Sequence, residues 1–167
     1  AAFLAQHGCQ SVCVDNDPVA GDSGDNLLND EFYHGLRARV RAGEFLAIFA
    51  APPCSTFSIS RHFRKNGGPP VVRGRDPRHV YGLPDVPGSH RRELNDANAL
   101  VSRMCTLLSD GWAVGTQFAI ENPVDRGDRS LPRAFLEESH CPIWMMPEMR
   151  ELARLCSTEF ANFPMCE

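Results

Sequence analysis

The sequence predicts an α/β fold with a mostly parallel sheet and helices on both faces. Short apolar runs alternate along the chain with segments whose apolar residues recur at helical spacing. The runs 45–50 and 112–120 are the clearest strands, and the segment 93–110 is the clearest helix. Regular alternation of strands and helices favours parallel strands with covered faces. The length of 167 residues fits one domain or a piece of one.

Up to position 50 the pattern predicts helices around short strands. Apolar residues recur at helical spacing over 31–42, Asn29 or Asp30 can cap this segment, and Gly43 can end it. In chain order we expect the tail of a helix over 1–7 ended by Gly8, a strand over 11–14, a brief strand over 26–28, the helix 31–42 and the strand 45–50.

Beyond position 50 a long basic loop separates the two clearest strands. The segment 61–89 is rich in Gly, Pro and Arg and shows no periodicity, which in a compact domain is typical of a loop that is either functional or disordered. The expected elements after it are a helix over 93–110 ended by Gly111, a strand over 112–120, a short helix over 131–139, a strand over 143–145, a helix over 147–155 and a last strand over 158–163.

The composition is that of an ordinary globular chain. Hydrophobic residues make up 43%, no apolar run approaches the length of a membrane span, and no signal-peptide pattern is present. The seven cysteines are odd in number and lie mostly in apolar or helical patterns, which favours a reducing compartment, nuclear or cytoplasmic, over secretion. Cys9 and Cys13 fit core positions better than metal ligands, because no second Cys/His pair has suitable spacing. We therefore expect no metal and no membrane partner.

A cysteine follows the first of the two clearest strands. The apolar run 45–50 ends at Ala51, and Pro52, Pro53 and Cys54 come next. The prolines fix φ and lack an N–H, so the sheet cannot continue and the thiol is held in a set direction. Ligands of open α/β sheets bind at this carboxyl edge of the strands. The pattern favours Cys54 as a nucleophile; the alternative is a small buried core residue.

The second clear strand also ends in a Pro-flanked polar group. Glu121, Asn122 and Pro123 follow the run 112–120. A thiol and a carboxylic acid at the ends of neighbouring strands can act together as nucleophile and acid.

The two motifs, PPCSTFS and AIENP, resemble the nucleophile motif and the E-N-V motif of the DNA cytosine-5 methyltransferases. The resemblance implies a Rossmann-like methyltransferase fold in which Cys54 adds to C6 of cytosine and Glu121 assists at N3. C5 then takes the methyl group of S-adenosylmethionine. Ser55 stands where the family usually has Gln, and Pro123 where it usually has Val. These forms are closer to divergent methylase-like domains found near mobile-element proteins.

Two acids are candidate cofactor ligands. Asp15 follows the expected strand 11–14, where an acid can accept hydrogen bonds from both hydroxyls of a ribose; the alternative is a turn-forming Asp. Asp25 resembles the acid that contacts the adenine amino group in the same family, and the resemblance places Pro52 beside the cofactor. The alternative for Asp25 is an ordinary acidic residue of a loop.

The resemblance covers only the central part of a methyltransferase. The family's glycine-rich loop and first strand have no counterpart before Ala1, and no target-recognition domain is visible. The chain begins with alanine within a helical pattern and stops within an approach to a strand. We therefore expect positions 1–167 to form a partial catalytic domain, cut at both ends, that binds the cofactor poorly alone.

The net charge of −4 is unusual for a nucleic-acid binder, but positive charge gathers directly after the Cys54 loop. This position favours contacts with the phosphates of a DNA partner; the alternative is a solvated loop. The candidate nucleic-acid-binding residues are Ser58, Arg61, Arg64, Lys65, Arg73 and Arg75.

Two other functions stay open. A cysteine hydrolase would need a histidine to activate Cys54, and His62 and His140 are the candidates. A non-catalytic nucleic-acid-binding or structural remnant within a mobile-element polyprotein is the alternative from a different class, and the missing ends favour it.

Overall fold

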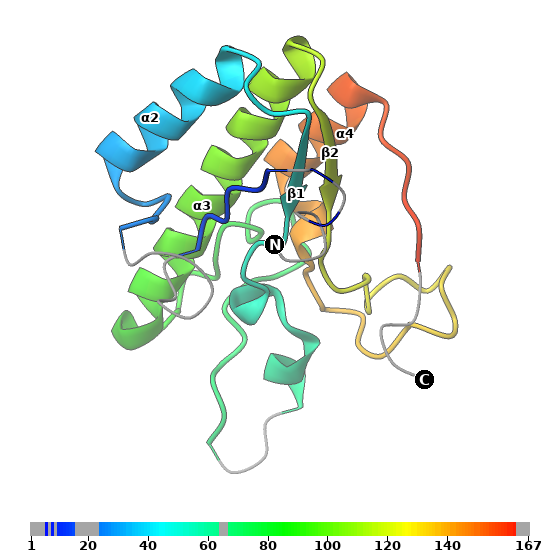
Figure 1. Cartoon of the computed structure of the whole chain (residues 1–167). Coiled ribbons are helices and arrows are strands. Elements are labelled where there is room, and N and C mark those ends of the chain that lie inside the picture. Colours follow the sequence, from blue (N-terminus) through cyan, green and yellow to red (C-terminus); the bar gives the residue numbers. More distant parts are fainter. Residues whose placement is uncertain (1–5, 7, 9, 16–23, 64–66, 163–167) are drawn as a thin grey trace.

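The computed structural model describes residues 6, 8, 10–15, 24–63 and 67–162 (Figure 1). Within these ranges the chain is α/β, with three α-helices and a two-stranded parallel sheet. The helices are α2 (Asp30–Arg41), α3 (Gly88–Ala113) and α4 (Pro147–Cys156), and the strands are β1 (Ala47–Ala50) and β2 (Gln117–Ile120). Three short 3₁₀ helices are η1 (Ser55–Phe57), η2 (Ile59–His62) and η3 (Ile143–Met145).

The parallel pairing of the two clearest strands is confirmed. Ala47 lies opposite Gln117, and Ala50 lies opposite Ile120. Glu121 N–H continues the ladder by donating to the carbonyl of Ala50 at 2.9 Å. Both strands therefore end at the same edge of the sheet, so the Cys54 loop and the Glu121 loop leave it side by side.

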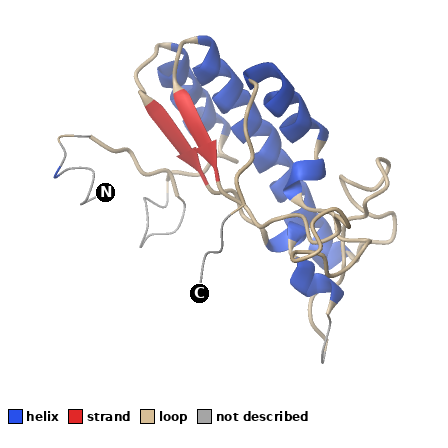
Figure 2. Ribbon diagram, turned by 90° about the vertical axis from the view of Figure 1, so that its right-hand side faces the viewer, coloured by secondary structure: helices blue, strands red, loops and turns tan. Residues whose placement is uncertain are grey.

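The helices cover one face of this sheet in the described part of the chain, whereas the sequence predicts cover on both (Figure 2). Ile48 and Phe118 point inward, against the cluster that contains Leu108, Ile143 and Met146. On the opposite face Phe49 is 71% exposed. Both strands thus alternate between a packed side and an open side.

The helix expected over 31–42 forms with the expected ends. The side chain of Asn29 accepts a hydrogen bond from Phe32 N–H at 3.0 Å, as an N-cap should. Gly43 follows the helix with a φ of +73°, the left-handed conformation that glycine adopts without strain.

The helix α3 is longer than predicted at both ends, and the strand expected over 112–120 is shorter. Only its second half, β2, forms a strand. The helix α3 continues through Gly111 to Ala113, and Gly115, with a φ of +90°, makes the turn into β2. Gly111 lies inside the helix, at a point where there is little room for a side chain. A Cβ there would stand 3.3 Å from the side chain of Thr116 and 3.4 Å from that of Val40. This glycine provides close packing rather than a helix end.

Several shorter elements were predicted wrongly. Residues 11–14 and 158–162 are irregular, 26–28 form a turn, 131–139 fold into turns instead of a helix, and 143–145 form η3 instead of a strand. Ala134 and Phe135 N–H groups donate to the carbonyl of Leu131 and close a single turn. The next two N–H groups, of Leu136 and Glu137, donate to the carbonyl of Arg126, which folds the segment back instead of extending a helix. The helix expected over 147–155 is confirmed as α4. The predicted helix 1–7 and position 163 lie largely or wholly outside the described residues.

The segment expected to be a loop over 61–89 packs against α3 in its described part. Val72 and Val86 are buried and form a small cluster with Leu94 of α3. Irregular backbone is thus compatible with an ordered core contact here. Among the described helices, we find none with both the length and the apolar character needed to cross a membrane.

Candidate functional site

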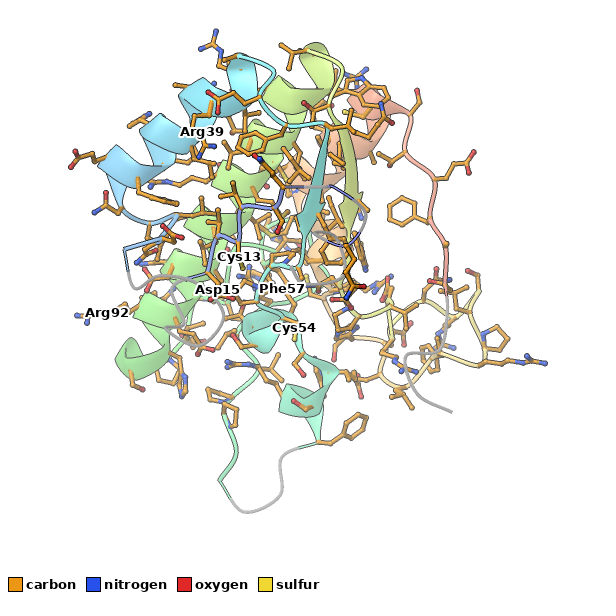
Figure 3. The ribbon with its side chains drawn as sticks, viewed as in Figure 1. Cys13, Asp15, Arg39, Cys54, Phe57 and Arg92 are labelled. Atoms are coloured by element: carbon orange, nitrogen blue, oxygen red, sulfur yellow. The ribbon has the colours of Figure 1, made fainter. Side chains whose placement is uncertain are left out.

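The thiol of Cys54 stands just beyond the carboxyl end of β1 (Figure 3). Cys54 is exposed, and its carbonyl accepts a hydrogen bond from Phe57 N–H at 2.9 Å, which closes the turn η1. Among the other described cysteines, Cys105 and Cys141 are buried, and burial raises their pKa to about 12 and about 11. These two thiols stay protonated near neutral pH, so they are poor nucleophiles.

The second motif lies against the first. Asn122 Nδ2 donates to the carbonyl of Pro52 at 2.9 Å, so the two Pro-flanked loops are joined directly. Trp144 Nε1 donates to the carbonyl of Pro123 at 2.9 Å and holds the second loop from η3. Glu121, the candidate acid, is half-buried at the end of β2. The sequence does not by itself predict a role for Asn122, although its place in the ENP motif is a signal.

The three candidate cofactor residues line one cavity. Asp15, Asp25 and Pro52 all border a space of about 370 Å³ beside β1. Most of its wall is apolar and comes from the segment 12–15, α2, β1 and α3. This volume lies within the range of small-molecule sites. Figure 3 shows Asp15 on the same side of the molecule as Cys54, beyond the end of β1.

The expectation that Arg61 contacts nucleic-acid phosphates is wrong. Arg61 is 4% exposed, and its guanidinium donates to the Ser55 carbonyl at 2.7 Å and to the Pro70 carbonyl at 3.0 Å. It also pairs with Glu93 of α3 at 2.5 Å. Burial is the largest single influence on Glu93 and opposes its ionisation, but the hydrogen bonds from Arg61, His90 and Ser55 and the charge of Arg61 together lower the pKa of Glu93. Arg61 therefore fastens the turn after Cys54 to α3.

Arg73 also fails as a phosphate contact, because it is 2% exposed. Its guanidinium donates to Thr56 Oγ1 at 3.0 and 3.2 Å, to the Val80 carbonyl at 2.6 Å and to Asn98 Oδ1 at 2.8 Å. It lies 3.9 Å from the centre of the Phe57 ring. Burial lowers the pKa of Arg73 to about 10, so the side chain is still a cation at neutral pH. Arg73 thus holds η1 from inside the protein.

The remaining candidates of this set differ from one another. Arg75 is half-buried and pairs with both carboxylate oxygens of Asp125 at 2.8 Å. Ser58 accepts a hydrogen bond from Ser60 N–H at 3.2 Å, which caps η2. Arg64 and Lys65 lie outside the described residues.

His140, a candidate only for the hydrolase alternative, connects the two motif loops from inside the protein. His140 is 2% exposed and lies between the Cys54 loop and the chain after Glu121. Nothing in the local sequence marks it, because its partners are backbone groups far away along the chain. Among the described residues no group of three His, Cys, Asp or Glu side chains could hold a metal ion.

Comparison of the chain with protein-family models, with curated proteins and with solved structures finds no match.

Proposed function

We propose that this chain is part of an S-adenosylmethionine-dependent enzyme that methylates C5 of cytosine in DNA, with a Rossmann-like fold. The observation that carries the proposal is the parallel register of β1 and β2. It brings an exposed thiol, Cys54, and a carboxyl group, Glu121, to one edge of the sheet. The cavity with Asp15 and Asp25 opens beside the same edge. The resemblance of the PPCSTFS and AIENP motifs supplies the reaction.

The roles of the two motif residues follow from the chemistry of cytosine. Ring carbon C5 is a weak nucleophile until a thiolate adds to C6. Cys54 forms that bond, and Glu121 holds a proton at N3 as the ring accepts the electron pair. After C5 has been methylated, loss of its proton lets the C6–S bond break, and the thiolate of Cys54 is restored. The target base must leave the DNA helix for this reaction, and an exposed Cys54 is accessible to such a base.

The residues around the cavity fit a nucleoside cofactor. S-adenosylmethionine, when bound, supplies the methyl group. Carboxylates such as Asp15 and Asp25 accept hydrogen bonds from ribose hydroxyls and from an adenine amino group. The apolar wall, which includes Leu27 and Leu36, suits the faces of a purine.

Covalent trapping tests this proposal. A DNA duplex with 5-fluorocytosine at the target should form a stable adduct with the full-length protein in the presence of S-adenosylmethionine, because fluorine cannot leave C5 as a proton does. Mass spectrometry should place the adduct on Cys54. Cys54→Ala should abolish the adduct, and Cys13→Ala, which removes another exposed thiol, should not. An adduct that persists in Cys54→Ala would refute the proposal.

A cysteine hydrolase has less support. His140 is occupied by two backbone groups, and His62 Nδ1 lies 3.3 Å from Ser139 Oγ. Neither bond is with Cys54, whereas a thiol hydrolase needs a histidine that takes the proton of its nucleophile.

A further inference from the structure

His140 makes one hydrogen bond to each of the two loops that carry the proposed catalytic groups. Its Nε2 lies 2.9 Å from the carbonyl oxygen of Phe57, three residues after Cys54. Its Nδ1 lies 3.1 Å from the backbone nitrogen of Arg126, five residues after Glu121. One buried ring therefore spans the two loops.

These partners fix the state of the ring. A carbonyl oxygen can only accept, so Nε2 carries a hydrogen and donates it to Phe57. The N–H of Arg126 can only donate, so Nδ1 must accept and carry no hydrogen. The neutral imidazole with hydrogen on Nε2 satisfies both bonds, and burial lowers the pKa of His140, which keeps the ring neutral.

The charged groups around His140 already have other hydrogen-bond and ion-pair partners. Asp125 Oδ1 is 3.7 Å from Nδ1, but this carboxylate pairs with Arg75 and accepts from Gly127 N–H at 2.8 Å. Arg75 also donates to the carbonyl of His140 at 2.9 Å. On the other side the ring of His62 is 6.0 Å away, centre to centre.

The chain leaves little room for this arrangement to change. A Cβ at Gly127 would stand 2.6 Å from Arg75 Nη1 and 2.9 Å from the carbonyl oxygen of His140. On the Cys54 side, Phe57 is buried and its ring lies against the guanidinium of Arg73. Both ends of the His140 bridge are therefore held in place by packing.

We propose that His140 is a positioning residue that sets the separation of the Cys54 and Glu121 loops. This inference rests on the proposed function of those two residues. His140 touches neither the base nor the cofactor; it acts through Phe57 and Arg126. Protonation of Nδ1 turns an accepting atom into a donor that faces the Arg126 N–H, so acid breaks the bridge.

Two variants test the proposal in the full-length protein. His140→Ala removes both bonds, and His140→Gln keeps a side-chain donor that can reach Phe57. The kcat for methyl transfer should fall by about 10- to 100-fold in His140→Ala, since small misplacements of reacting groups have effects of this size. KM for DNA should change little, because His140 does not contact the substrate. His140→Gln should recover part of the loss, and His34→Ala, an exposed histidine on α2, should be neutral.

Hydrogen exchange separates this inference from the proposed function. In His140→Ala, peptides that cover 54–60 and 122–128 should both exchange faster, while α4 should be unchanged. Faster exchange in both loops supports the bridge even if the parent protein transfers no methyl group, in which case the proposed function alone fails. Unchanged exchange in either loop, or an unchanged kcat in an active protein, would overturn the inference.

Discussion

Arginines of the same basic segment differ in burial: two are buried in the protein and one is exposed. Arg61 and Arg73 are 4% and 2% exposed, and their guanidinium groups are occupied by protein acceptors. The side chain of Arg78 is 80% exposed and pairs only with its neighbour Asp76 among the described residues. Because a long side chain can point inward from irregular backbone, the number of arginines in a loop does not indicate how many face a ligand. Here the two buried arginines hydrogen-bond to Ser55 and Thr56 and so hold the turn that follows Cys54.

The largest expected effect is the loss of Arg73. Arg73→Ala leaves the buried acceptors of Thr56 and Val80 and the half-buried amide oxygen of Asn98 without this donor, and it removes the contact with the Phe57 ring. We expect the free energy of unfolding to fall by about 3 kcal/mol, within the range for a broken buried hydrogen-bond network. Urea denaturation followed by circular dichroism measures it.

Arg78→Ala is the matched control for that change. It removes the same side chain from an exposed position, and its denaturation midpoint should stay close to that of the parent. Equal midpoints for the two variants would show that the buried arginine contributes no more to the free energy of unfolding than the exposed one.

The second prediction concerns the ion pair of Arg61. Glu93→Gln should destabilise the protein by about 1 kcal/mol, because the side chain of Glu93 is 35% exposed and water screens the pair. The pKa of Glu93 lies below its ordinary value of 4.5, so its contribution is present above pH 4.5 and is lost as the pH falls through the lower value. Denaturation midpoints at about pH 6 and about pH 3.5 should differ less in Glu93→Gln than in the parent. A parallel pH dependence would contradict this role.

The sequence allowed the parts of the fold with local causes to be predicted. The start of α2 follows from Asn29, its end from Gly43, and the parallel pairing from two apolar runs. Glycine at position 111 misled the prediction, because a packing glycine and a helix-ending glycine look alike in one sequence. The short strands at 11–14 and 158–163 were predicted from apolar residues alone, although a strand also needs a neighbour.

The candidate site was predictable where a motif marks it. Cys54, Asn122 and Glu121 lie in two short motifs that end neighbouring strands, and the structure joins those ends. The burial of Arg61 and Arg73 was not predictable, because their partners Glu93, Thr56 and Asn98 are distant or unremarkable in the sequence. His140 was missed as a connection between the loops for the same reason, since both of its bonds go to backbone groups.

The third prediction uses the buried histidine, which is an inward-pointing basic group like the two arginines. Burial holds the pKa of His140 below its ordinary value of 6.5, so the unfolded chain takes up the proton first. Stability should be complete above pH 6.5 and should fall as the pH drops through the folded value. His140→Gln should remove part of this decline. His62 has a lowered pKa with the same sign, so His62→Gln provides the comparison. A decline that is identical in the parent and His140→Gln would exclude His140 as its source.

The smallest expected effect concerns Arg78, the exposed arginine, and the half-buried Arg75. The salt dependence of DNA affinity tests whether either of them contacts DNA. Each phosphate contact that is lost should lower the slope of log affinity against log salt by ~0.9 on duplex DNA. Arg78→Gln should lower the slope by at most that amount, because Asp76 already neutralises part of its charge. Arg75→Gln should leave the slope unchanged, since Arg75 is engaged with Asp125 at two bonds. Fluorescence anisotropy of a labelled duplex at several salt concentrations measures both, and circular dichroism confirms that each variant is folded. If Arg75→Gln lowered the slope as much as Arg78→Gln, Arg75 would have to leave Asp125 in order to bind phosphate. A half-buried arginine of this segment would then contact DNA as the exposed one does, and the distinction between them would fail.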